Sequence, residues 1–345
     1  MIRLGGLDVG AAIAAVFLIV AGTAASPCLA QSASSAPASP YGDVAGDVVQ
    51  PYGILDTGVR RSVYVSPAGG ATQVVSGLNT SRFGVRGREI IDSDWQASFR
   101  LESGFNSGSG VQSNSGALFD RTAAVGLRWR AIDLKAGRQE AFGYELAANG
   151  TTDPLQMALN LPNYSSPAAA GSKAPVLGAN PLHAVYSYTY GQLRFNNSIR
   201  VSTSGENYSA GVFYVLGGVA GNSTAASVRA GHLGWHLEPV QVDAIAQQSQ
   251  DVQGHHSTLY ALAASLLVGP WNFQAGVHNL KIGAGFNSAN LGNGASGTGI
   301  LGNSTTVATV LATAKEDFTF RVSDLGATWT FAPGRLRTLA AYKSQ

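Results

Sequence analysis

Residues 81–105, SRFGVRGREIIDSDWQASFRLESGF, decide the fold class of this chain. The stretch predicts two β-strands joined by a short turn, because apolar and polar side chains alternate on both sides of the turn and successive strand residues face opposite sides. The apolar positions of the second strand are Trp95, Ala97, Phe99 and Leu101. The polar positions of the two strands include Arg82, Arg86, Arg88, Asp94, Arg100 and Glu102.

A sheet face with this many charges cannot form a dry core, because burying unpaired charge is too costly. Two architectures remain. Either the polar face meets bulk water on the outside of a β-sandwich, or it lines a wet interior while the apolar face meets lipid. The rest of the chain distinguishes them.

The first 30 residues are typical of a secretory signal peptide. Arg3 precedes an apolar run at residues 9–25, and Cys28-Leu29-Ala30 resembles a cleavage site before Gln31. The alternative is a signal anchor, since the run approaches the length that can span a bilayer. We expect cleavage, which removes the single cysteine and with it any disulfide or thiolate metal site. Residues 31–49, rich in Ala, Ser and Pro, are the expected flexible lead-in to one β-barrel at residues 50–345.

Composition excludes several classes of protein. The net charge is +2 and charged residues make up only 12% of the chain. This near balance gives no case for nucleic acid, which usually requires a strongly basic face. After residue 30 no apolar run is long enough for a membrane helix. If the mature chain spans a membrane, it must therefore do so as a closed barrel.

The alternating pattern recurs along the chain in segments about as long as a tilted membrane strand. Further examples are residues 193–201 (with Leu193, Phe195, Ile199 and Val201 on one face), 240–247, 271–278 and 324–331. Short breaks at 269–270 and 332–334 fit tight turns, whereas long polar stretches at 103–116, 217–224 and 283–304 fit loops. Short turns at one end and long loops at the other are expected of outer-membrane barrels.

Six motifs then occur in order: YGILDTGV at 52–59, SRFGVRGRE at 81–89, FRLESGF at 99–105, ALFDRTAAVGL at 117–127, KAGRQ at 135–139 and NSIR at 197–200. Their order and spacing resemble the general porins of Gram-negative bacteria, in particular the trimeric sixteen-stranded type of β-proteobacteria. The resemblance covers about residues 50–215, and the strand pattern alone extends it to the end.

The resemblance implies an all-β fold, a transmembrane antiparallel barrel of about 16 strands in the outer membrane. It implies contact with outer-membrane lipid, a homotrimer, and the diffusion of small hydrophilic solutes and ions through a water-filled pore. It also implies that a third loop, at about residues 140–180, folds into the barrel and narrows it. The family ends on an aromatic residue, whereas residues 335–343 lie where its penultimate strand would be, so we expect the last strand to be missing.

By residue match, the resemblance assigns the basic wall of the constriction to Arg82, Arg121, Arg138 and Arg194, and its acidic loop to Glu140, Glu145 and Asp153. The alternation adds Arg100, Glu102 and Arg200 as further lumen residues. Arginine suits such a wall because it stays charged at any physiological pH. Each of these side chains could instead be a solvated or paired residue away from the narrowest point.

Two of the arginines do not fit the alternation. Arg121 shares the parity of Val125, Leu127 and Trp129, which should face lipid, so its inward placement requires a bulge between them. Arg138 shares the parity of Ile132 and Leu134, and it escapes the lipid face only if it lies at the end of its strand.

Other functions find less support. His232 and His236 have the spacing of a zinc pair, but that spacing needs a helix and a third ligand, so we interpret them as structural. No cofactor motif and no catalytic constellation is present, so we do not expect an enzyme. The alternatives are an outer-membrane barrel enzyme and a secreted β-rich adhesin. Because arginines outnumber acids in the expected constriction, we predict a mild anion preference at low salt.

Overall fold

The structure is a computed structural model, and it describes residues 48–62, 71–76, 80–113, 117–149, 194–287, 291, 315–331 and 336–344. The expected signal peptide, Asp153 and most of the expected infolded loop lie outside the described residues. The first strand begins at Val48, two residues before the expected start of the barrel. No described helix is both long and apolar enough to cross a bilayer.

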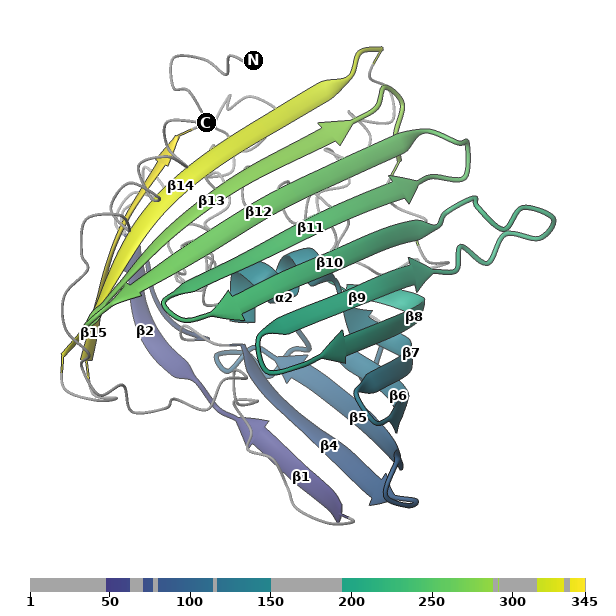
Figure 1. Cartoon of the computed structure of the whole chain (residues 1–345), viewed down its shortest axis with the longest axis horizontal. Coiled ribbons are helices and arrows are strands. Elements are labelled where there is room, and N and C mark those ends of the chain that lie inside the picture. Colours follow the sequence, from purple (N-terminus) through teal and green to yellow (C-terminus); the bar gives the residue numbers. More distant parts are fainter. Residues whose placement is uncertain are drawn as a thin grey trace. The chain divides into compact units, whose positions relative to one another are not determined.

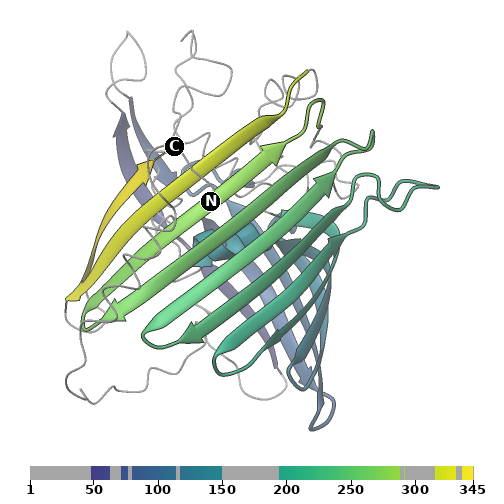
Figure 2. The same cartoon turned by 45° about the horizontal axis from the view of Figure 1, so that its top comes forward.

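Thirteen strands of the described chain form one antiparallel sheet in which each strand pairs with the next, except that β1 pairs with β4. They are β1 (Val48–Ile54), β4 (Ser81–Ile90), β5 (Trp95–Phe105), β6 (Thr122–Trp129), β7 (Ile132–Glu140), β8 (Arg194–Ser204), β9 (Tyr208–Val215), β10 (Val228–Leu237), β11 (Val240–Gln250), β12 (His256–Val268), β13 (Trp271–Ile282), β14 (Phe318–Phe331) and β15 (Leu336–Ser344). Figures 1 and 2 show them as a continuous series of tilted strands. The prediction of an all-β antiparallel fold is confirmed. Within the described residues β1 and β15 are the two edges of this sheet.

A short hairpin extends the β1–β4 pair. Strand β2 (Thr57–Ser62) follows β1 after two residues, and it pairs antiparallel with β3 (Ala71–Ser76), which precedes β4. The two strands form a separate small sheet.

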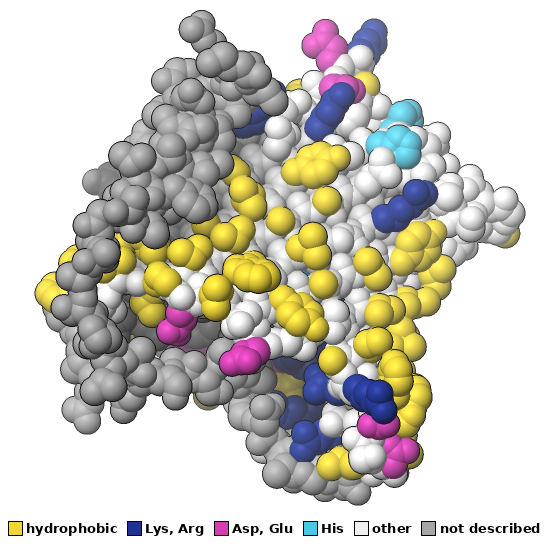
Figure 3. Space-filling model, viewed as in Figure 1, with side chains coloured by type: hydrophobic (Ala, Val, Ile, Leu, Met, Phe, Trp, Pro, Cys, Tyr) yellow, Lys and Arg dark blue, Asp and Glu magenta, His cyan; other side chains and the backbone are white. Residues whose placement is uncertain are grey.

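The two faces of the large sheet differ as the alternation predicts. Large apolar side chains are exposed on one face, among them Phe83, Val125, Leu233, Tyr260 and Leu325. Figure 3 shows such side chains in a band across the strands in front. The opposite face, called the inner face below, carries buried polar groups such as Gln247, Gln274 and His278. An apolar outer face and a polar inner face are what a membrane barrel requires.

All five tryptophans of the chain lie near the ends of strands that meet in short turns. Trp95 begins β5 and Trp129 ends β6, with ring centroids 6.2 Å apart. Trp271 begins β13 and stacks on Trp329 of β14 at 5.2 Å. Trp235 lies near the end of β10 and is 56% exposed. Tryptophans gathered at one level of a membrane protein form a girdle at the membrane–water interface.

One helix packs on the inner face. Helix α2 (Phe142–Asn149) follows β7 directly and contacts β10 and β11. Its Phe142 ring lies 5.9 Å from the Phe213 ring of β9, and both belong to an apolar cluster that includes Leu146, Val228, Ile245 and Leu280. The inner face of β9–β13 is therefore partly apolar where α2 covers it.

Phe195 lies on the opposite face of the sheet from the one expected. Phe195 was expected on the lipid face with Ile199 and Val201, but it is only 1% exposed, whereas Ile199 and Val201 are about 40% exposed. The pairing of β7 with β8 shifts register between Gly137 and Gln139. Asn197 in the opposing segment has φ +50° and Gly137 has φ +127°. A bulge adds a residue to one strand, so Phe195 changes sides and joins the apolar cluster.

Candidate pore constriction

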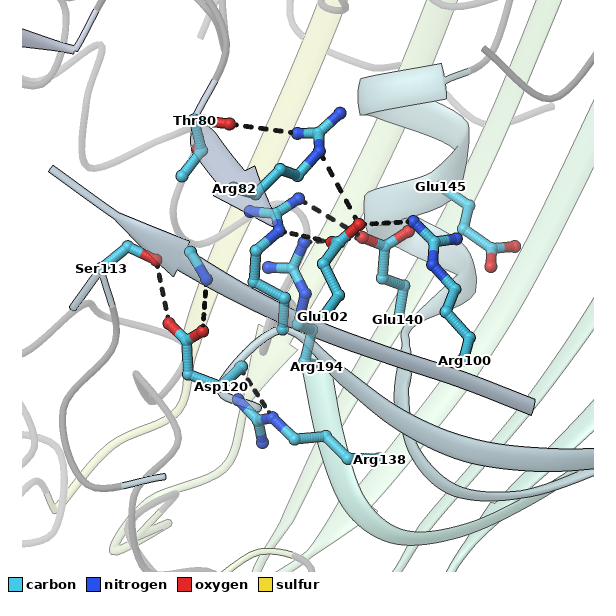
Figure 4. Close-up of polar contacts among 12 residues, drawn as sticks. Thr80, Arg82, Arg100, Glu102, Ser113, Asp120, Arg138, Glu140, Glu145 and Arg194 are labelled. Atoms are coloured by element: carbon cyan, nitrogen blue, oxygen red, sulfur yellow. Dashed lines mark hydrogen bonds and ion pairs between the residues drawn. The ribbon is translucent and has the colours of Figure 1, made fainter. Parts of the chain in front are cut away.

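Glu102 of β5 lies at the centre of a charged cluster on the inner face, formed with Tyr52, Arg82, Arg100 and Arg121 and called the Glu102 cluster below (Figure 4). Its carboxylate is completely buried. Oε1 accepts a 2.6 Å hydrogen bond from Arg121 Nε, and Oε2 accepts bonds from Arg100 Nη2 at 2.7 Å and the Tyr52 hydroxyl at 2.8 Å. Arg82 Nε lies 3.7 Å from Oε2. Three cations thus share one carboxylate.

A glycine makes this arrangement possible. Tyr52 of β1, Gly84 of β4 and Glu102 of β5 lie opposite one another across three strands. A Cβ at Gly84 would lie 2.8 Å from the Tyr52 hydroxyl and ring, and 2.4 Å from the Leu101 carbonyl. Tyr52 therefore reaches Glu102 only because residue 84 has no side chain.

A second acid extends the cluster along the wall. Glu140 Oε1, at the end of β7, accepts a 2.6 Å hydrogen bond from Arg194 Nη2 and lies 4.0 Å from Arg121 Nη2. Arg194 also stacks on Tyr144 of α2, with its guanidinium carbon 4.8 Å from the ring centroid. Arg82, Arg121 and Arg194 of the expected basic wall are thus brought together around two glutamates.

Arg138 lies beside this group but bonds differently. Its Nε donates to the Asp120 carbonyl at 2.8 Å and its Nη1 to Asn196 Oδ1 at 2.6 Å. Strand β7 stays in regular register with β6 as far as Arg138, which pairs with Ala123 two residues before the last residue of the strand. That Arg138 escapes the lipid face only by lying at the strand end therefore stays a prediction. The β7–β8 pair has a bulge beside Arg138, which the alternation does not reveal.

Arg121 also reaches the inner face without the expected bulge inside its strand. The β5–β6 pairing is regular from Trp129 to Thr122. Strand β6 begins at Thr122, so Arg121 lies just before the strand, where alternation no longer applies. Its backbone N–H donates to the Glu102 carbonyl at 3.1 Å, which holds it next to that residue.

The two described acids of the expected constriction loop lie in different elements. Glu140 was assigned to the infolded loop, but it is the last residue of β7 and lies on the same wall as the arginines. Glu145 lies in the first turn of α2 and forms an ion pair with Arg200 of β8. The guanidinium of Arg200 also lies 4.4 Å from the Phe142 ring centroid. Where the structure describes them, both acids therefore pair directly with arginines.

Two polar residues that hold this site together were missed by the sequence reading. Tyr52 bridges Arg100 and Glu102, and Asp120 accepts hydrogen bonds from the Gly104 N–H at 2.7 Å and the Ser113 hydroxyl at 2.9 Å. Both lie inside the quoted motifs at 52–59 and 117–127. Their place inside two of the motifs that carry the resemblance was the available signal.

The histidine pair lies on a strand and not on a helix. Nε2 of His232 and Nε2 of His236 lie 2.9 and 3.1 Å from the same oxygen, Asp243 Oδ1. In the described part of the chain no group of three or more His, Cys, Asp and Glu is placed to bind a metal ion. The ring of His232 lies 5.5 Å from that of Phe142, so this pair contributes to seating α2.

The arrangement carries a surplus of positive charge. Arg82, Arg100, Arg121 and Arg194 face Glu102 and Glu140, which leaves two positive charges unbalanced in this group. Fixed charges that line a wet passage select ions by sign. An antiparallel sheet with a lipid-type outer face and such a cluster of charges on its inner face is typical of β-barrel channels.

The chain belongs to the Gram-negative porin family, whose model matches residues 11–345. It is therefore a protein of the outer membrane. An outer-membrane porin protein of Bordetella pertussis is 38% identical over 105 residues, which is 26% of this chain and 27% of that relative's length.

Solved porin structures share the fold. An anion-selective porin from Comamonas acidovorans superposes with a TM-score of 0.58 at 20% identity, covering 86% of this chain and 78% of that one. OmpF of Salmonella typhi in complex with daunomycin gives a TM-score of 0.51 at 15% identity, covering 86% and 78%. OmpT of Vibrio cholerae gives 0.53 at 11% identity, covering 88% and 77%.

Proposed function

We propose that this chain forms a water-filled pore through which small hydrophilic solutes and ions diffuse, with a mild preference for anions, and that it catalyses no reaction. The observation that carries this proposal is the group of four arginines around only two glutamates on the inner face. The solved anion-selective porin from Comamonas acidovorans supports the same sign of preference.

The preference follows from where the charges lie. Three of the four arginine side chains (Arg82, Arg121 and Arg194) are mostly buried and held by hydrogen bonds and ion pairs, so they are fixed in place. A solute that leaves bulk water needs replacement polar partners, and fixed guanidinium groups supply them best to anions. The two glutamates reduce the surplus, which makes the preference mild.

Assembly and targeting complete the proposal. We infer a homotrimer, as the family resemblance implies, and removal of residues 1–30 as a signal peptide during export. Helix α2 and the segment after it are the proposed narrowing element, since α2 lies against the inner face of the sheet and its Glu145 is paired with the wall residue Arg200.

The test is the reversal potential in a salt gradient across a planar bilayer. Replacing Arg82 and Arg194 together by alanine leaves Arg100 and Arg121 against Glu102 and Glu140, so the surplus disappears. We expect the anion preference at about 0.1 M salt, where the Debye length is about 10 Å, to fall.

The matched control is Arg130→Ala, which removes an arginine that is 64% exposed and paired with Asp94 in a short turn. It should leave the reversal potential unchanged. A cation preference of the wild-type pore, or equal reversal potentials for wild type and the double variant, contradicts the proposal. Absence of any conductance from correctly folded protein rules out the pore itself.

A further inference from the structure

A basic cavity lies on the inner face of β4–β8. Its volume is about 350 Å³. Six cationic side chains line it: Arg86, Arg88, Arg100, Arg128, Lys135 and Arg200. Figure 3 shows Lys and Arg side chains gathered over β4 and β5, more densely than elsewhere in this view. We propose that this cavity binds small solutes that carry two or more negative charges close together, such as pyrophosphate.

The cavity extends from the Glu102 cluster toward the short turns. Arg100 belongs to both, but Arg88 is three residues from the turn after β4, and Arg128 and Lys135 flank the turn between β6 and β7. Three of its cations therefore lie away from the charges to which we attribute ion selectivity. Binding here and selectivity at the Glu102 cluster can be changed independently.

The charge balance of the lining favours a multiply charged anion. Three carboxylates, Asp133, Glu140 and Glu145, lie among the six cations, which leaves three positive charges in excess. Asp133 serves two cations at once, at 3.5 Å from Arg128 and 3.2 Å from Lys135. An added polyanion can supply the missing negative charge to several cations, whereas chloride can approach only one or two of them.

The cations come from separate strands, which makes bridging possible. Arg86 and Arg88 lie on β4, Arg128 on β6 and Lys135 on β7. Arg86 also donates hydrogen bonds from Nη2 and Nε to Gln50 Oε1, at 2.9 and 3.3 Å. Arginine presents several donors in a planar fork that matches phosphate oxygens. A compact ion with oxygens on two centres can therefore contact more than one strand.

Part of the inner face of β9–β13 is apolar. Strands β9–β13 contribute Phe213, Val215, Ile245 and Leu280 to the apolar cluster that packs with Phe142 of α2. Hydrated ions gain nothing from such a surface. The basic cavity therefore offers charged partners that this apolar cluster does not. This inference rests on the proposed pore function and adds a solute class and a place of binding to it.

The test is block of chloride current by pyrophosphate in bilayers of phosphatidylcholine, which contain no anionic lipid to compete. We compare the wild type with the triple variant Arg88→Gln, Arg128→Gln, Lys135→Gln. Each cation about 4 Å from an anion is worth roughly a factor of five in binding even in water. We therefore expect the half-blocking concentration to rise about tenfold or more at low salt.

The matched control removes three cations outside the cavity: Arg130→Gln, Arg229→Gln, Lys281→Gln, all of them exposed. It should leave the half-blocking concentration near the wild-type value. Equal shifts of the half-blocking concentration in both triple variants overturn the inference. So does a wild-type current that falls no more on addition of pyrophosphate than on addition of chloride at the same ionic strength.

Two readouts separate this inference from the proposed function. A wild-type pore that prefers anions but is not blocked by pyrophosphate refutes the binding site and leaves the pore standing. If the protein does not conduct, calorimetric titration of the detergent-solubilised protein with pyrophosphate decides the matter. The site is supported if the wild type and the control variant show a heat of binding that the cavity variant has lost. It is refuted if the wild type shows no heat of binding.

Discussion

Neutralising Glu102 should destabilise the protein more than neutralising any exposed charged side chain. Glu102→Gln keeps the shape of the side chain but leaves Arg82, Arg100 and Arg121 without their shared anion. Breaking a buried ion pair from one side costs roughly 3–5 kcal/mol. Arg100 is 39% exposed and stays partly hydrated, so we discount its share and expect a loss of about 2–4 kcal/mol.

The assay is guanidinium unfolding in detergent, followed by the loss of heat-modifiable mobility on gels and by circular dichroism. The control is Asp94→Asn, which breaks an exposed 3.1 Å pair with Arg130 in a turn and should cost less than about 1 kcal/mol. A double-mutant cycle between Glu102→Gln and Tyr52→Phe measures the interaction energy between these two side chains, which meet over Gly84. If Glu102→Gln unfolds at the same denaturant concentration as Asp94→Asn, the central role assigned to this carboxylate is wrong.

Two further predictions concern α2 and an external loop. Gly211→Val should displace α2 and raise the single-channel conductance, because a Cβ at residue 211 would lie 2.7 Å from Phe142 Cζ; an unchanged conductance contradicts the proposed narrowing by α2. The pKa of Asp317 lies below the ordinary aspartate value because Lys281 and the Ala284 N–H donate hydrogen bonds to its carboxylate. Because this pKa is depressed, the contact should persist at neutral pH and be lost only as pH falls through the lowered pKa. Lys281→Met should raise the titration midpoint measured by NMR, and an equal midpoint in both proteins contradicts the assignment.

The strands and their faces could be predicted from the sequence because alternation is a local property. Residues 81–105 were expected to form two strands joined by a turn, and β4 and β5 pair from Ser81 with Phe105 to Ile90 with Gln96. The two faces of β11 and β13 likewise match the expectation, with Asp243 and Gln274 buried on the inner face. Lipid outside and water inside impose this pattern on every strand.

Interactions between strands could not be predicted in the same way. The bulge near Arg138 depends on a positive φ at Asn197 and Gly137, and neither residue type demands it on its own. Glu140 could not be placed at a strand end, because helix α2 begins only two residues later and the boundary depends on packing. The hydrogen bond from Tyr52 to Glu102 depends on a glycine of the strand between them.

The tryptophan girdle sets the depth at which the barrel lies in the bilayer. The aromatic rings of Trp95, Trp129, Trp271 and Trp329 form two contacting pairs at the short-turn ends of their strands. Indole rings prefer the headgroup level, so the leaflet on the short-turn side fixes the vertical position of the protein. No tryptophan of the chain lies at the loop ends, and a change in thickness of the other leaflet should therefore be taken up by the loop ends of the strands. Thickening the bilayer would then bury those ends while the turn-side cavity keeps its distance from the water.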